Sequence, residues 1–140
     1  MLHLLDRCKT VCYTNEVLYH YVKRVDGSSI TTASFSSKKL DWVKHCRENL
    51  AFIRQRYPEL EADAAYRYRG SILWAMREIL LAKEDYRKQY GDLKKELIKE
   101  AALFAKTPLA SYKQKLYYAI FLRFPFFLNR AAVRIKERLK

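Results

Sequence analysis

KKLDWVKHCRENLAFIRQRYPEL, residues 38–60, is the stretch that decides which fold the sequence predicts. At about 100° per residue, its apolar side chains share one side of a helix that runs from about Lys38 to Tyr57. These side chains are Trp42, Val43, Cys46, Leu50, Ile53 and Tyr57. Pro58 ends this helix and suits the first turn of another, because that position needs no backbone N–H donor. The stretch therefore predicts an amphipathic helix followed at once by a second helix.

The second helix is predicted over residues 59–86, with an inner stripe of Tyr66, Leu73, Met76 and Leu80. Gly70 interrupts it at a cost of about 1 kcal/mol relative to alanine. Three acidic residues, Glu59, Glu61 and Asp63, stand at its start, where the helix dipole favours negative charge; we prefer this interpretation to a metal site. Since only one turn separates the two helices, they are predicted to form an antiparallel hairpin.

Further helical patterns follow the hairpin. A third helix is predicted from about Asp92 to Lys106, with Leu93, Leu97, Ile98 and Phe104 as apolar residues. The segment SYKQKLYYAIFLRF, residues 111–124, is apolar nearly all round, and a last helix is expected from Phe126 to the end. The chain has three glycines and three prolines in 140 residues, which suits long helices. We predict a mainly α fold.

The N-terminal region shows a different pattern. KTVCYT (residues 9–14) and VLYHYVK (residues 17–23) alternate β-branched and aromatic residues with a period of two, which is typical of strands. An uncharged connector, GSSITTASFSS (residues 27–37), comes next, and Ser36 or Ser37 can cap the first long helix. The sequence thus predicts one or two short strands that have no sheet to join.

Charge indicates the class of partner. There are 28 lysines and arginines against 15 acidic residues, a net charge of +13. Residues 106–140 hold nine of the basic residues and one acidic residue, Glu137, a net charge of +8. A surface of this sign favours a polyanion, either nucleic acid or an anionic membrane.

The basic tail also has an apolar stripe. On a helical wheel, Leu128, Ala131, Ala132, Ile135 and Leu139 fall within about 100° of one another, with basic residues on both sides. This pattern predicts a helix that lies in the plane of an anionic membrane surface, although the stripe could instead pack on the chain's own core. The predicted membrane-binding residues are Phe121, Arg123, Phe124, Phe126, Phe127, Arg130, Arg134, Lys136, Arg138 and Lys140.

Catalytic and metal-binding motifs are not found in the sequence. Its soft ligands, Cys8, Cys12, His20, His45 and Cys46, have no paired spacing, and no glycine-rich phosphate loop is present. We therefore expect no metal, no cofactor and no catalytic residue in this chain. The odd cysteine count indicates a reduced, intracellular protein, and Arg123 interrupts the best candidate for a membrane span.

Arginines alternate with tyrosines in AYRYRGS (residues 65–71), and basic residues flank aromatic ones in KQKLYYAIFLR (residues 113–123). Such a pattern could form a stacking and phosphate-binding surface for single-stranded nucleic acid. More often it lines a helix interface, with the arginine and lysine stems across the rings. A basic nucleic-acid-binding protein and a structural interaction module are therefore the alternative functions.

Three segments in order resemble the region after the catalytic core in bacterial family-2 glycosyltransferases of capsular and exopolysaccharide synthesis. They are LYHYVKRVDGSSI (residues 18–30), FSSKKLD (residues 35–41) and LAFIRQRYPEL (residues 50–60). They are similar to the family's "plY-Y-x-R-x-GSI", "FS-x-K-x-L-D" and "L-x-F-I/F-x-x-x-y-P-E-L" patterns, with an extra residue or two before Gly27. Members of the family and this chain both end in a basic, aromatic tail.

The resemblance implies a division of the chain. Residues 1–30 would be remnant strands of a GT-A-type α/β catalytic domain, residues 31–105 a helical module, and residues 106–140 a basic amphipathic tail. The family's catalytic domain, with its D-x-D motif, divalent cation and nucleotide-sugar, is expected upstream and is absent here. The resemblance thus implies an accessory region that is inactive alone. Its expected location is cytoplasmic, peripheral on the inner face of the cell membrane. Its expected partner is a catalytic glycosyltransferase domain or another polysaccharide-synthesis protein.

Overall fold

The computed structural model describes residues 2–16, 19, 34–99 and 109–139. The chain divides into two compact units, Met1–Ala33 and Ser34–Lys140. Helices make up most of the described residues, so the mainly α fold is confirmed. The second unit contains the predicted hairpin and the C-terminal helices, and it carries all the surfaces considered below.

The strand predicted over residues 9–14 is not observed. In the first unit, a helix that the sequence did not predict, α1 (Leu2–Arg7), is followed by exposed residues 8–16 without helix or strand. A strand needs the backbone of a neighbour to pair its N–H and C=O groups, and none of the described residues forms a strand. The alternating pattern alone therefore does not produce one. The strand predicted over residues 17–23 lies outside the described residues, apart from the exposed Tyr19.

The first long helix forms as predicted. A 3₁₀ turn, η1 (Ser37–Leu40), leads into α2 (Asp41–Arg56), which buries Val43, Cys46 and Leu50. Ser36 occupies the N-cap position, but its hydroxyl makes no capping bond; its carbonyl instead accepts a hydrogen bond from the Lys39 N–H at 2.9 Å. Trp42, predicted on the inner side, is 57% exposed because the contact with α3 covers a narrower arc than the apolar stripe.

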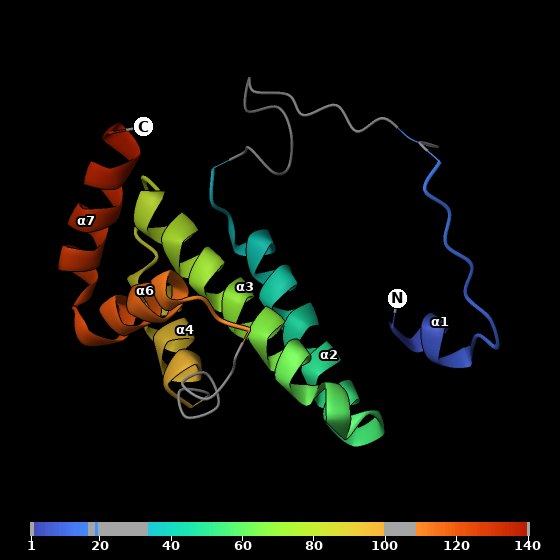
Figure 1. The fold of residues 1–140 in the computed structure, drawn as a ribbon. Helices are drawn as coiled ribbons and strands as arrows, with labels where there is room; N and C mark the ends of the chain where they lie inside the picture. Colours follow the sequence, from blue (N-terminus) through green and yellow to red (C-terminus); the bar gives the residue numbers. More distant parts are fainter. Residues whose placement is uncertain (1, 17–18, 20–33, 100–108, 140) are drawn as a thin grey trace. The chain divides into compact units, whose positions relative to one another are not determined.

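Helix α3 (Glu61–Leu81) is the centre of the second unit. It follows the short η2 turn (Pro58–Leu60) and packs antiparallel to α2, which confirms the hairpin (Figure 1). Its C-cap is Ala82, so the helix ends before the predicted Tyr86. Because α4 and α7 also pack against α3, its buried surface is broader than the predicted stripe, in which Tyr66 and Leu73 are only half-buried. The buried apolar residues are Ala64, Ala65, Tyr68, Ile72, Ala75, Met76, Ile79 and Leu80.

The described residues of the second unit also form α4 (Arg87–Lys99), α6 (Tyr112–Arg123) and α7 (Phe126–Arg138). α4 starts earlier than predicted; Leu93 and Leu97 are buried as expected, whereas Ile98 is exposed. α6 begins with a capping box, in which the Ser111 hydroxyl accepts from the Gln114 N–H and the Gln114 side chain accepts from the Ser111 N–H. Phe104 lies outside the described residues.

Gly70 gives a test of the α3 assignment. It lies on the exposed side of α3, and a Cβ atom added there would meet no atom within 4 Å. Alanine costs less backbone entropy than glycine in a helix, so we expect Gly70→Ala to raise the free energy of unfolding by about 1 kcal/mol. Urea denaturation followed by circular dichroism measures this change, and a lower stability would contradict a helix at this position.

Candidate membrane-binding surface

The buried side of α7 is held by a polar side chain. Asn129 is 2% exposed, and its Nδ2 atom donates to the Tyr90 hydroxyl at 2.9 Å and to the Phe124 carbonyl at 3.1 Å. Burial raises the pKa of the Tyr90 phenol, and the hydrogen bond with Asn129 opposes that rise. Val133 is the other buried residue of α7. These contacts fix which side of α7 faces the core.

A salt bridge attaches the end of α7 to α3. The Arg77 Nη2 atom donates to a carboxylate oxygen of Glu137 at 2.7 Å. This hydrogen bond raises the pKa of Arg77, so the guanidinium is charged at any physiological pH. Glu137 is the tail's acidic residue, and its charge is directed at α3 and partly screened from solvent.

Two arginines of α7 contact the C-terminal end of α3. The Arg130 and Arg134 Nη2 atoms donate to the same carbonyl, that of Ala82, at 2.9 and 3.2 Å. α3 has no basic residue in its own last turn. The negative end of its dipole therefore receives positive charge from α7.

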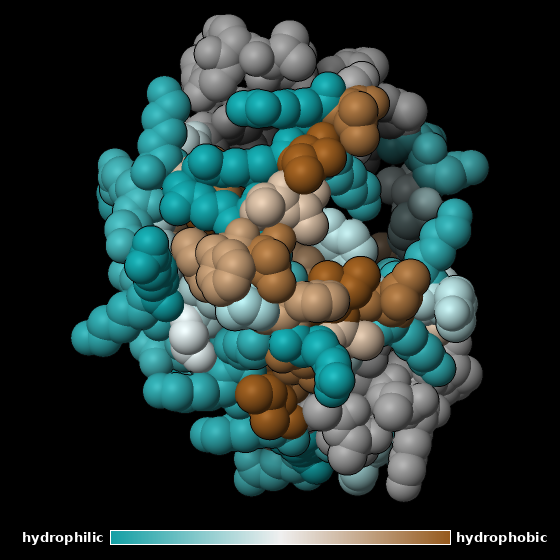
Figure 2. All heavy atoms as spheres, turned by 90° about the vertical axis from the view of Figure 1, so that its left-hand side faces the viewer, coloured by the Kyte–Doolittle hydropathy of each residue, from teal (hydrophilic) through white to brown (hydrophobic). Residues whose placement is uncertain are grey.

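The apolar stripe of α7 points away from the core. All five of its residues are exposed, and Ile135 and Leu139 reach exposed fractions of 59% and 82%. Within residues 34–99 and 109–139, the stripe therefore does not pack on the core, contrary to the alternative given above. Figure 2 shows the side of the molecule on which α6 and α7 lie, with apolar residues across its middle and polar residues around them. We call Leu128, Ala131, Ala132, Ile135 and Leu139 the α7 apolar face.

The four predicted phenylalanines occupy different environments. Phe121 is 1% exposed within the core, so its ring is not available to a membrane, contrary to the prediction. Phe126 is half-buried and packs edge-on against Tyr90, with the ring centroids 5.0 Å apart. Phe124 and Phe127 are 43% and 67% exposed. Only these last two phenylalanines add to the exposed apolar surface, because α6 turns Phe121 inward.

The predicted basic residues also separate into two groups. Arg130 and Arg134 donate hydrogen bonds to the Ala82 carbonyl, as described above. Arg123, Lys136 and Arg138 are exposed, and the Lys136 ammonium lies 4.7 Å from the centroid of the Tyr117 ring. Lys140 lies outside the described residues. Exposed positive charge is thus present beside the α7 apolar face.

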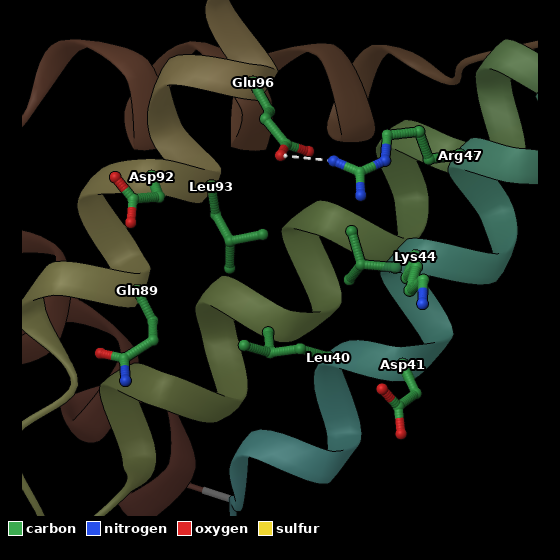
Figure 3. Close-up of a pocket in the computed structure, with 9 residues that line it drawn as sticks. Leu40, Asp41, Lys44, Arg47, Gln89, Asp92, Leu93 and Glu96 are labelled. Carbon is green, nitrogen blue, oxygen red and sulfur yellow. Dashed lines mark hydrogen bonds and ion pairs between the residues drawn. The ribbon is translucent and has the colours of Figure 1, made fainter.

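A groove of about 260 Å³ between α2 and α4 has different chemistry (Figure 3). Leu40, Val43 and Leu93 supply its apolar surface. Arg47 and Glu96 face each other across one end at 3.2 Å, and Glu96 also accepts a hydrogen bond from the Tyr68 hydroxyl at 2.5 Å. Both carboxylate oxygens of Glu96 therefore already have partners.

The described residues contain no group of three histidine, cysteine or acidic side chains that could hold a metal ion. Among them, no helix has the length and apolar character needed to cross a membrane. Comparisons with protein-family models, curated proteins and solved structures find no match to this chain.

Proposed function

We propose that this chain is a helical module that binds the surface of an anionic membrane through α7. The module would be the accessory region of a family-2 glycosyltransferase of polysaccharide synthesis, held at the cytoplasmic face of the membrane. The observation that carries the membrane interaction is the exposure of the α7 apolar face on the side of the helix that points away from the core.

Free energies of transfer favour placing the α7 apolar face in a membrane over leaving it in water. Burying a leucine or isoleucine side chain completely is worth about 1.5–3 kcal/mol. Leu128, Ile135 and Leu139 would each recover part of this value in the acyl region of a leaflet. Each basic residue near an anionic leaflet adds about 1 kcal/mol. The sum of several kcal/mol is enough for reversible binding.

The link to glycosyltransferases rests on the three sequence segments described above. In this proposal the chain has no catalytic residue. The divalent cation and the nucleotide-sugar would bind to a catalytic domain, and that domain is the proposed partner of this chain. Nucleic acid would account for the positive charge, but it gives no role to an exposed aliphatic stripe. A membrane accounts for both properties.

Ile135→Asp is the variant that tests the proposal. A carboxylate in the middle of the α7 apolar face opposes insertion into the leaflet, and the residue is exposed, so the fold should be retained. We expect vesicle affinity to fall at least about ten-fold, since the variant loses about 1 kcal/mol of apolar burial and also places a carboxylate, which must lose water, in the leaflet. The measurement is co-sedimentation of the full chain with vesicles that contain increasing fractions of phosphatidylglycerol.

Ile98→Asp is the matched control, because Ile98 is 54% exposed on α4 and the substitution changes the charge equally. It should retain nearly the full affinity. Binding should also rise with anionic lipid and weaken with salt. Equal losses in both variants, or no vesicle binding by the unmodified chain, would refute the membrane proposal; binding to single-stranded nucleic acid in place of vesicles would favour the alternative.

A further inference from the structure

Three arginines gather where α7 meets the α3–α4 connection. Arg130 and Arg134 share the Ala82 carbonyl, so their guanidinium groups lie next to each other. Arg87, at the start of α4, contacts the same ring as Arg130: the Arg87 and Arg130 Cζ atoms lie 5.6 and 5.8 Å from the centroid of Phe126. We call Arg87, Arg130 and Arg134 the arginine cluster.

The positive charge of the cluster is only partly compensated. In the part of the chain that the structure describes, neither Arg130 nor Arg134 pairs with a carboxylate. Arg87 pairs with the exposed Asp85 at 3.6 Å. The end of the α3 dipole contributes about half a negative charge. Glu84, in the same connection, accepts a hydrogen bond from the Tyr86 hydroxyl, and Lys83 precedes it. The three guanidinium groups and Lys83 together still exceed these two carboxylates and the dipole end.

The donors of the cluster suit a phosphate group. A guanidinium carries five N–H donors in a planar fork, and Ala82 accepts from one nitrogen of Arg130 and one of Arg134. The exposed Arg134 and Arg87 thus keep donors for a ligand with several acceptor oxygens. Phosphate has such oxygens and binds arginine through paired hydrogen bonds.

The cluster lies at the right place for a lipid headgroup. Arg130 and Arg134 are four residues apart and follow one edge of the α7 apolar face. When that face enters the acyl boundary of a leaflet, the polar edge of the helix stays at the level of the headgroups. The phosphates of the lipids occupy this level.

We propose that Arg87, Arg130 and Arg134 form a phosphate-binding site that takes the phosphate of an anionic lipid. This inference rests on the proposed membrane association and adds selectivity for the headgroup. It predicts that the nature of the anionic group, and not surface charge alone, decides how tightly the chain binds.

Headgroup selectivity is measured with two sets of phosphatidylcholine vesicles, one with phosphatidic acid and one with oleate, matched in zeta potential. We expect the unmodified full chain to bind the phosphatidic acid vesicles about ten-fold more tightly, the value of one charge-assisted hydrogen bond. In Arg130→Lys/Arg134→Lys the charge is kept but the forked geometry is lost, so the two affinities should agree within about two-fold. Arg87→Lys, at an exposed position, should reduce the preference without affecting the fold.

Arg123→Lys/Arg138→Lys is the control, because both arginines are exposed and lie outside the cluster. It should retain the preference for phosphatidic acid. Equal affinity of the unmodified chain for the two vesicle sets, or a preference that survives in all cluster variants, would overturn the phosphate site. Such a result leaves the membrane proposal intact, since Ile135→Asp tests that interaction separately.

A soluble ligand distinguishes the lipid from a free phosphate compound. Glycerol 3-phosphate should shift the side-chain Nε–H signals of the cluster in NMR spectra more than acetate at the same ionic strength, because a phosphate has more acceptor oxygens and more charge than a carboxylate. Its affinity should be well below that for phosphatidic acid vesicles, because it makes no contact with the α7 apolar face. Absence of any shift would overturn the site, and an affinity equal to that for vesicles would overturn the assignment to a lipid.

Discussion

Replacing Leu50 by alanine is expected to lower the free energy of unfolding by about 2–5 kcal/mol, the usual cost of truncating a buried leucine. Leu50 is 2% exposed and lies in the contact between α2 and α3. Its loss would leave a cavity in the hairpin that the rest of the second unit packs around. Denaturation by urea, followed by the helical circular dichroism signal, measures the difference.

Leu139→Ala is the matched control for this prediction. Leu139 is 82% exposed at the end of α7, so its truncation should change the stability by no more than about 0.5 kcal/mol. A cost below this value for Leu50→Ala would mean that the α2–α3 contact is open in solution. Equal costs for the two leucines would contradict the burial pattern.

The hairpin could be predicted because its determinants are local. The apolar period of residues 38–57 and the position of Pro58 together specify two helices and a short turn. Val43, Cys46 and Leu50 were placed correctly, since a single neighbouring helix selects the centre of an apolar stripe. Trp42 was predicted on the inner side but is exposed, because periodicity gives the direction of an apolar stripe and not the width of the contact that covers it.

The burial of α3 could not be predicted from one stripe. In AYRYRGS the structure buries Tyr68 and Arg69, at exposed fractions of 4% and 1%, so much of this segment is interior. The nucleic-acid interpretation had taken its arginines and tyrosines as a surface. Residues of α2, α4 and α7 surround α3, and no local pattern shows how many neighbours a helix has.

The orientation of α7 depends on particular hydrogen bonds. Its most apolar stripe is exposed, whereas its buried side contains Asn129, which bonds to Tyr90 and to carbonyl groups at the end of α6. These partners are distant in sequence or belong to the backbone of another helix. A hydrophobic period cannot identify them, although a lone asparagine in an apolar segment is a signal that a buried polar contact exists.

Phe121→Ala separates the structural phenylalanines from those available to a membrane. Phe121 is 1% exposed, with its ring centroid 5.3 Å from that of Tyr117. We expect its truncation to lower the free energy of unfolding by about 3–5 kcal/mol, as for other buried phenylalanines. At temperatures where the variant is still folded, its affinity for phosphatidylglycerol vesicles should be close to that of the unmodified chain.

Phe127→Ala should give the opposite result, because Phe127 is 67% exposed beside the α7 apolar face. We expect a stability change within about 0.5 kcal/mol. Vesicle affinity should fall about ten-fold, since inserting a phenylalanine ring into a leaflet contributes roughly 1.5 kcal/mol or more. Urea denaturation of Phe121→Ala and Phe127→Ala tests the predicted stability changes, and co-sedimentation of the same variants with vesicles tests the predicted affinities. If Phe121→Ala lost vesicle affinity without losing stability, α6 and not α7 would present the aromatic ring to the membrane, and the burial described here would be wrong.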